Sequence, residues 1–322
     1  AVGGVSPGAD ERKVLAENMT LATAHAAYLE AVSDRQSPRW AGLKRKMFEH
    51  HVPDTLAHKP IKDIQRLDLA DLGDRIAKRG YPTQANRVQS EVMACLRWCA
   101  DQDLIASVPT LGRRSRQPES PRDRTLTDAE LGDLWAHLSA LTPVVADFMR
   151  LLVLTGQRRD EVRCIHTSEI DTRSRVWTIP ADRYKTGRAH TVPLPDGAWE
   201  VIERRMAEIG GGYLLPHRDG PEKPWNGTRN AMEQVRRAVT GKPDYTLHDI
   251  RRTVRTGLAR LGIAAEVAEA VIGHAPQGIV KVYDRYDRLD ERRRALEAWE
   301  RQVRGLAGEG TSNVVQLERA VS

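Results

Sequence analysis

The spacing of hydrophobic positions separates a first part of the chain, with helical periodicity alone, from a second part in which the periodicity changes. Across residues 17–106 apolar side chains recur three and four positions apart, which predicts successive amphipathic helices. The stretches with this spacing are NMTLATAHAAYLEAVS, PRWAGLKRKMFEHHV, LDLADLGDRIAKRG and TQANRVQSEVMACLRWCADQDLI. Since no strand-like alternation interrupts them, we expect residues 1–112 to form a helical domain.

A segment without periodicity follows these helices. Residues 110–124, TLGRRSRQPESPRDR, contain two prolines, five arginines and no recurring apolar position. Polar stretches of this kind between periodic segments are typical of linkers. We therefore expect a basic interdomain linker at residues 113–124.

A second domain is predicted to begin directly after the linker. Thr127 and Glu130 have the spacing of a capping box, which marks a helix start. The apolar stretch TPVVADFMRLLVLTG then predicts a helix that ends at Gly156, and RRDEVRCI resumes helical spacing. These patterns predict helices at the beginning of the second domain.

The period then changes from helical to two. RVWTIP at residues 175–180 and HTVPLP at 190–195 predict two strands of a β-hairpin. Helical spacing returns at Ala198 and continues to about residue 304, so only helices are expected there. The predicted fold is mainly α with a small β-hairpin or sheet. Its second domain covers residues 125–304 and is followed by a C-terminal tail, residues 305–322.

Charge changes this picture by indicating a partner. The 322 residues carry a formal charge of +6 with a sequence pI near 9.3, which favours an anionic partner, nucleic acid before a membrane surface. No apolar run approaches the roughly 18 residues that span a bilayer, and the first residues lack the apolar stretch of a signal peptide. We therefore expect a soluble, cytoplasmic protein without membrane contact. The chain opens on Ala1, which suggests a processed or truncated N-terminus.

The cysteines do not indicate a disulfide framework. Cys95, Cys99 and Cys164 are too few, and no Cys/His group shows zinc-finger spacing. We expect reduced thiols, no metal site and no cofactor.

The first candidate for chemistry lies in DYTLHDIRRTVRTGLARLG. Thr246 and Asp249 again have capping-box spacing, so a helix is predicted to begin at Leu247. His248 and Arg251 then share a face of its first turn, where free N–H groups favour an anion such as phosphate. A solvated polar helix face is the alternative for this stretch alone.

Two further basic residues are weaker candidates by themselves. Arg158 follows the helix break at Gly156 and is predicted at the start of the next helix. Lys185 lies in the predicted hairpin loop, where a solvated turn lysine is the simpler interpretation.

Taken in order, these residues resemble one family, the tyrosine recombinases or phage integrases. TGQRRDEV resembles its first-arginine box, KTGRAHTVPL its hairpin lysine box, LHDIRRT its His-x-x-Arg box and IGHAPQGIVKVY its Gly-His box with a downstream tyrosine. The resemblance covers residues from about 125 to 304 and implies an α+β catalytic domain. The preceding helices are similar to the family's core-binding domain. The resemblance implies these catalytic residues: Arg158, Lys185, His248, Arg251, His274 and Tyr283.

The resemblance also chooses between two tyrosines. Helical geometry alone does not distinguish Tyr283 from Tyr286, three positions later. In the family the nucleophile lies nine residues after the second histidine, His274, which selects Tyr283. Tyr286 is then expected to pack or to contact the DNA backbone.

Roles follow from the same resemblance. The arginines would clamp the phosphate oxygens, supplying the charge that a metal ion supplies in other phosphoryl-transfer enzymes, and the histidines would add hydrogen bonds. Lys185 would donate a proton to the leaving 5′ oxygen, and Tyr283 would form a 3′-phosphotyrosine. Glu161 resembles an acidic position that supports the site, with an ordinary helix ion pair to Arg158 as the alternative.

Double-stranded DNA is the implied partner, held in a C-shaped clamp by both domains. A homotetramer on two synapsed sites is implied, as are accessory DNA-bending or directionality proteins. Basic residues of the first domain and the linker are the candidate phosphate contacts, with a merely soluble linker as the alternative. These residues are Arg39, Lys44, Arg45, Lys46, Arg113, Arg114, Arg116, Arg122 and Arg124.

The function expected from the sequence is thus a site-specific recombinase that integrates or excises a mobile element. Two alternatives are a type IB topoisomerase-like enzyme that relaxes DNA, and a non-catalytic DNA-binding regulator with a recombinase fold. Covalent adduct formation on a cognate site distinguishes the regulator from both enzymes.

Overall fold

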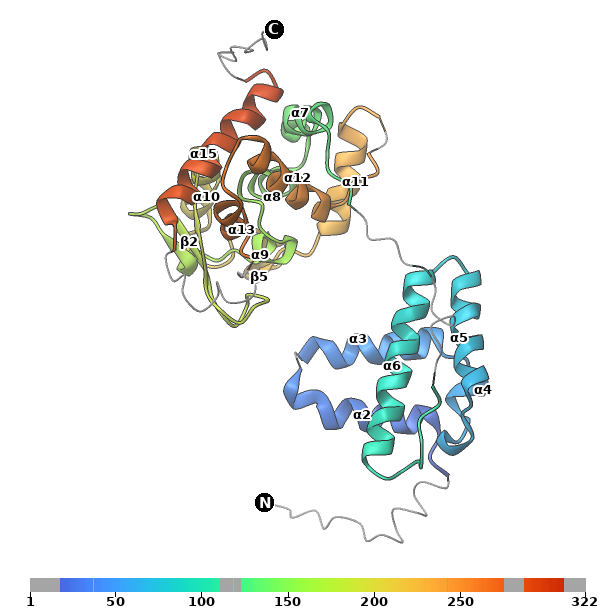
Figure 1. The fold of residues 1–322 in the computed structure, drawn as a ribbon. Helices are drawn as coiled ribbons and strands as arrows, with labels where there is room; N and C mark the ends of the chain where they lie inside the picture. The colour runs from blue at the N-terminus through green and yellow to red at the C-terminus, as the bar shows by residue number, and fades with distance from the viewer. Residues whose placement is uncertain are drawn as a thin grey trace, which may run out of the picture. The chain divides into compact units, whose positions relative to one another are not determined.

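The computed structural model describes residues 18–36, 38–110, 118, 123–241, 243–274 and 287–309 (Figure 1). The chain divides into two compact units, residues 1–121 and 122–322, and each has its own hydrophobic core.

The described part of the first unit consists of helices. The α-helices are α2 (Leu21–Val32), α3 (Pro38–His51), α4 (Asp54–Ala57), α5 (Arg66–Lys78) and α6 (Pro82–Asp101). The short 3₁₀ helices are η1 (Ser33–Arg35) and η2 (Ile61–Asp63). Four of these α-helices overlap the four stretches whose helical spacing predicted them. The prediction of helices in this part of the chain is therefore confirmed.

The core of the first unit explains why these helices form. On α5 the residues Leu69, Leu72 and Ile76 are buried, three and four positions apart, and they face α6. On α6 the buried positions include Val88 and Val92, again at helical spacing. Most of the stability of such helices comes from burying this face rather than from intrinsic propensity.

The second unit is mixed. Its α-helices are α7 (Asp128–Ala136), α8 (Pro143–Thr155), α9 (Arg159–Arg163), α10 (Asp196–Ile209), α11 (Thr228–Ala238), α12 (Leu247–Arg260), α13 (Ala265–Val271) and α15 (Leu289–Leu306). The 3₁₀ helices are η4 (Leu138–Ala140) and η5 (Thr167–Glu169). The strands are β1 (Ile170–Asp171), β2 (Val176–Ile179), β3 (His190–Pro193), β4 (Pro216–His217) and β5 (Gly220–Pro224).

The predicted hairpin is confirmed as β2 and β3. The two strands pair antiparallel with Trp177 opposite Val192, and β1 adds a third strand beside β2. The expectation of helices alone after Ala198 was wrong, because β4 and β5 form a second antiparallel pair. The stretch HRDG covers the end of β4, the two connecting residues and the start of β5, where Gly220 has φ 132°. A strand of two residues is too short to show a period in the sequence.

Helix α8 lies at the centre of the second unit. Nearly every residue from Val145 to Thr155 is buried, and α8 packs against α10, α12 and α15. The indole Nε1 of Trp299 on α15 donates to the carbonyl of Val153 at 2.8 Å. The end of α8 is therefore held firmly, and that end is where the first-arginine box begins.

Candidate active site

The first-arginine box is positioned by the end of α8. Gly156 adopts the left-handed conformation with φ 63°, and a Cβ there would lie 2.9 Å from Val254. The chain turns at this point and makes Arg158 the N-cap of α9. The predicted helix break at the glycine, with Arg158 at the start of the next helix, is confirmed.

Glu161 holds Arg158 from within α9. One carboxylate oxygen accepts from the backbone N–H of Arg158 at 2.8 Å, and the other accepts from its guanidinium at 2.7 Å. Burial, the largest single influence, would lower the pKa of Arg158, but the interactions of its guanidinium with Glu161 and Tyr184 together outweigh burial, so the pKa is raised. Arg158 is a permanent, oriented cation.

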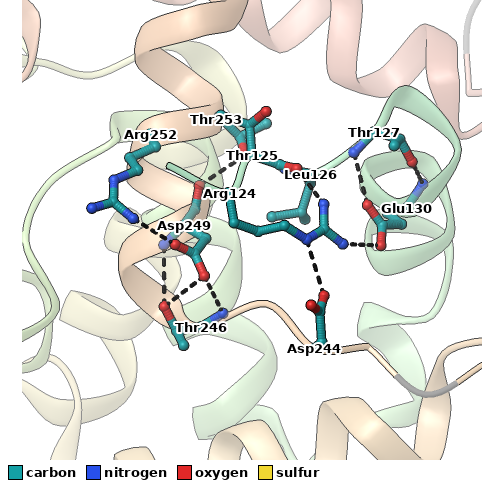
Figure 2. Close-up of polar contacts among 10 residues, drawn as sticks. All are labelled: Arg124, Thr125, Leu126, Thr127, Glu130, Asp244, Thr246, Asp249, Arg252 and Thr253. Atoms are coloured by element: carbon teal, nitrogen blue, oxygen red, sulfur yellow. Dashed lines mark hydrogen bonds and ion pairs between the residues drawn. The ribbon is translucent and has the colours of Figure 1, made fainter. Parts of the chain in front are cut away.

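The predicted capping box at the start of α12 is present (Figure 2). Asp249 accepts from the backbone N–H of Thr246 at 2.8 Å and from Arg252 at 2.9 Å. The helix begins at Leu247, as the sequence predicted, so His248 and Arg251 lie in its first turn.

Arg251 is the most unusual charge of the site. Only 4% of the residue is exposed, and its guanidinium donates to the carbonyl of Gly156 at 2.8 Å and to that of Ile272. Burial and the neighbouring charge of Arg158 lower its pKa to about 10, so it stays charged at neutral pH. Two arginines thus lie close together, one of them held by neutral carbonyls, which favours an anionic ligand.

His248 is exposed on the first turn of α12. Partial burial, followed by the charges of Arg252 and Arg251, lowers its pKa, so the imidazole is neutral at pH 7. A neutral ring offers one N–H donor to a ligand.

The hairpin places Lys185 and its neighbour in different surroundings. Lys185 is exposed in the loop between β2 and β3. Tyr184, one residue earlier, is buried, and the Arg158 guanidinium lies 4.9 Å from its ring centroid. The loop therefore contacts Arg158 through the ring of Tyr184.

His274 follows α13 and is held by a carboxylate. Its Nδ1 donates to Glu269 at 2.6 Å, and Glu269 also accepts from Arg255 at 2.8 Å. Burial would raise the pKa of Glu269, but these hydrogen bonds outweigh it and the pKa is lowered. An ionised carboxylate accepts only, so the bond orients the histidine ring.

The tyrosines of the last box, Tyr283 and Tyr286, lie outside the described residues. The structure brings Arg158, Arg251 and the turn before His274 into one cluster, joined through Tyr184. Pattern reasoning did not single out Tyr184 or the buried Gln157, and the only signal for them is their place beside predicted site residues.

The predicted phosphate contacts have mixed surroundings. Lys44 donates to the buried Glu91 at 2.5 Å, whereas Arg45 and Lys46 are exposed on α3. Arg39 lies on α3, and its side chain is outside the described part. Outside the described residues altogether are Arg113, Arg114, Arg116 and Arg122.

Arg124 is engaged within the second unit (Figure 2). Its Nε donates to Asp244 at 3.0 Å, and its terminal nitrogens donate to Glu130 and to the carbonyl of Thr125. Two carboxylates therefore compete with any DNA phosphate for this guanidinium.

The cysteines and the residue types that bind metals complete the description of the reactive side chains. The three cysteines are free thiols. Within the described ranges no group of three or more His, Cys, Asp or Glu side chains is arranged to hold a metal ion. None of the helices in those ranges is both long and apolar enough to cross a membrane.

Comparison with known sequences gives a consistent result. The model of the phage integrase family matches residues 124–289. Prophage integrase IntA of Escherichia coli K12 is 28% identical over 274 residues, and this alignment covers 81% of the chain and 63% of IntA. Prophage integrase IntZ of the same organism is 25% identical, with 85% of the chain and 69% of IntZ covered. The chain thus spans about two thirds of the length of these relatives.

Comparison with solved structures concerns the fold. Lambda integrase, crystallised as a dimer bound to a COC′ core site, has a TM-score of 0.64 at 19% identity, covering 80% of this chain and 96% of that one. The Tn1549 transposon integrase in complex with a circular intermediate DNA has a TM-score of 0.65 at 16% identity, with 80% and 92% covered. The mainly α fold with small sheets, predicted from the sequence, is confirmed. Because the family model spans more than half of the residues, this chain belongs to the phage integrase family.

Proposed function

We propose that the chain is a tyrosine site-specific recombinase of the integrase type, which cleaves and rejoins DNA to integrate or excise a mobile element. The observation that supports this best is the pair of arginines, Arg158 and Arg251. Within the described residues the hydrogen bonds of Arg251 go to backbone carbonyls, so its charge is available to a phosphate. Planar guanidinium groups bind phosphate oxygens bidentately.

In the proposed cleavage step the hydroxyl oxygen of Tyr283 attacks the scissile phosphorus and its proton passes to solvent. The new bond from oxygen to phosphorus forms as the bond from phosphorus to the 5′ oxygen breaks. Lys185 gives a proton to that 5′ oxygen, which leaves as a hydroxyl. Religation is the reverse attack by a 5′ hydroxyl of another strand, which restores the tyrosine.

The remaining residues stabilise charge. Arg158 and Arg251 are oriented before the reaction and face the charge that develops on the non-bridging oxygens. His248 and His274 add hydrogen bonds to the same phosphate. Glu161 and Glu269 orient Arg158 and His274 respectively, since each carboxylate already holds its partner.

The partners are proposed on the same basis. Lambda integrase has been crystallised as a tetramer bound to a Holliday junction. We expect four copies of this chain to join two double-stranded sites in the cytoplasm, with accessory DNA-bending proteins setting the direction. The helical domain at residues 1–112 and the linker at 113–124 would hold the duplex, and residues 125–304 would perform the chemistry.

The test is covalent trapping on nicked suicide duplexes drawn from the DNA that flanks the gene. Wild type, Tyr283→Phe and Tyr286→Phe are compared on a denaturing gel. The expected result is an adduct with wild type and Tyr286→Phe and none with Tyr283→Phe. Loss with Tyr286→Phe alone would assign the nucleophile to Tyr286.

The same preparation tests the other functions. Tight binding to a duplex by wild type without any adduct would indicate a non-catalytic regulator. Relaxation of supercoiled plasmid without site preference or strand exchange would indicate a type IB topoisomerase-like enzyme.

A further inference from the structure

The C-terminal end of α13 is a meeting point of three boxes that lie far apart in the sequence. The helix closes with a Schellman motif, in which Gly273 has φ 63° and its N–H donates to the carbonyl of Ala270 at 3.1 Å. The N–H of His274 donates to the carbonyl of Glu269 at 3.0 Å. The next carbonyls, at the end of the helix, have no intrahelical partner and need donors from elsewhere.

Three successive carbonyls receive those donors from three different side chains. Val271 accepts from Gln157 Nε2 at 2.8 Å, and Gly273 accepts from the hydroxyl of Tyr184 at 2.8 Å. Ile272, between them, accepts from Arg251. The three donors come from the first-arginine box, the hairpin and α12.

Tyr184 contacts two parts of the site at once. It is 4% exposed, and its ring lies between the guanidinium of Arg158, 4.9 Å from the ring centroid, and the ring of His190, stacked at 4.9 Å. A Cβ on Gly273 would lie 1.7 Å from the Tyr184 hydroxyl, so only glycine fits there. The tyrosine therefore connects Arg158 to the turn that precedes His274.

Gln157 makes a parallel connection through the backbone. It is fully buried, and its Nε2 also donates to the carbonyl of Thr155 at 2.9 Å. It thereby joins the residues on either side of the Gly156 turn to the end of α13, one position before Arg158.

We propose that Tyr184 and Gln157 are positioning residues that set Arg158 and His274 in register for strand cleavage. This inference rests on the proposed recombinase function. Arg251 has five N–H donors, and two of its hydrogen bonds go to the carbonyls of Gly156 and Ile272. The two positioning residues hold the carbonyls on either side of Ile272, so Arg251 keeps its other donors for phosphate. Small displacements of such groups cost far more in rate than in binding.

The test uses the full chain and a matched tyrosine. Tyr184→Phe removes the hydroxyl and keeps the ring against Arg158, whereas Tyr184→Leu removes both. Tyr245→Phe is the control, because Tyr245 is also buried in the second unit, at 1% exposure, and its hydroxyl has no hydrogen-bond partner among the described residues. Gln157→Met keeps the length of the side chain and removes its donor.

The measured quantity is the single-turnover rate of adduct formation at saturating nicked duplex. We expect about a tenfold loss for Tyr184→Phe and Gln157→Met and about a hundredfold loss for Tyr184→Leu, with DNA Kd within about twofold of wild type. The control should react at the wild-type rate. A wild-type rate for Tyr184→Phe would overturn the inference. Rate losses accompanied by a similar fold loss of DNA affinity and by a lowered melting temperature would also overturn it.

A second measurement separates this inference from the proposed function. Hydrogen exchange of residues 268–274 in the free protein is expected to accelerate in Tyr184→Phe and Gln157→Met and to stay unchanged in Tyr245→Phe. If wild type forms no adduct on any duplex, the proposed function fails. Accelerated exchange would then still support the link between Tyr184 and α13, and unchanged exchange would overturn it.

Discussion

Each unit buries a charged residue to the same extent, but the two charges have different partners. In the helical unit Glu91 is 4% exposed and is held by Lys44 at 2.5 Å and by the ring of His25 at 3.3 Å. In the second unit Arg251 is also 4% exposed, but its hydrogen bonds among the described residues go to carbonyl oxygens. Burial, followed by the charge of the nearby Arg158, lowers the pKa of Arg251.

We propose that this difference separates a structural charge, Glu91, from a functional one, Arg251. A buried carboxylate with cationic partners is balanced, and its removal leaves those partners without a counter-ion. A buried cation held only by carbonyls is oriented but its charge is not neutralised, so a bound anion would neutralise it. The comparison predicts that changes at Glu91 alter stability first and that changes at Arg251 alter chemistry first.

The largest expected effect is at Arg251. Arg251→Lys keeps a charge but cannot reach both carbonyls and a phosphate, because an ammonium lacks the planar fork. We expect the rate of adduct formation to fall about a thousandfold. Single-turnover trapping measures this, with Arg260→Lys, an exposed position on the same helix, as the control. An equal rate loss in the control, or a melting temperature lowered as much as by loss of Glu91, would contradict the comparison.

The next effect is at Glu91. Glu91→Ala leaves His25 and Lys44 without their carboxylate, and we expect the free energy of unfolding of the helical unit to fall by about 3 kcal/mol. Urea denaturation measures it, with Glu30→Ala, exposed on α2, as a control expected to stay within about 0.5 kcal/mol. The adduct rate at saturating DNA should hardly change at temperatures where the variant is folded. Unaltered stability would show that the buried cluster is not structural.

The smallest effect at neutral pH is at His190, a buried residue close to the charges of Arg292, Arg251 and Arg158. Burial, then the charge of Arg292 and those of Arg251 and Arg158, lowers the pKa of His190 from 6.5 to about 3. On acidification the imidazole of His190 therefore binds a proton near pH 6.5 in the unfolded chain but only near pH 3 in the folded chain. This contribution to stability is complete above pH 6.5 and is lost as the pH falls toward 3.

The expected slope from this residue is about 1.4 kcal/mol per pH unit within that window. Because His51 and His248 also have lowered pKa values, the measurement compares wild type with His190→Phe in urea denaturation from pH 7 down to about pH 4. The variant should lose less stability on acidification. Parallel curves for the two proteins would mean that His190 is protonated in the folded state.

Local pattern predicted much of the fold. The capping boxes at Thr127 and Thr246 and the helix end at Gly156 were found from residue type and spacing alone, as was the β2–β3 hairpin. These features depend on hydrogen bonds and side-chain faces within a few residues of each other. The β4–β5 pair was missed because strands of two and five residues, rich in proline and glycine, show no alternation of apolar positions.

The candidate site divides in the same way. The order and spacing of the boxes identified Arg158, His248 and Arg251 as candidates, and the positions of their helix starts followed from capping chemistry. The hydrogen-bond partners of these residues could not be predicted from residue order and spacing. Arg251 reaches Gly156 across 95 positions of sequence, and Gln157 reaches Val271 across 114. Lys44, predicted as a phosphate contact, instead has Glu91, 47 positions away, within hydrogen-bond distance.

The sequence by itself thus determined the helices, the hairpin, the family and the set of candidate side chains, because each rests on local periodicity or on a motif of a few residues. Only the tertiary structure decided which charges are balanced and which remain open to a ligand, and that Tyr184 and Gln157 join Arg158 to the end of α13. The physical reason is that pairing and desolvation depend on which elements pack together, and residues distant in the chain meet only after the core has formed.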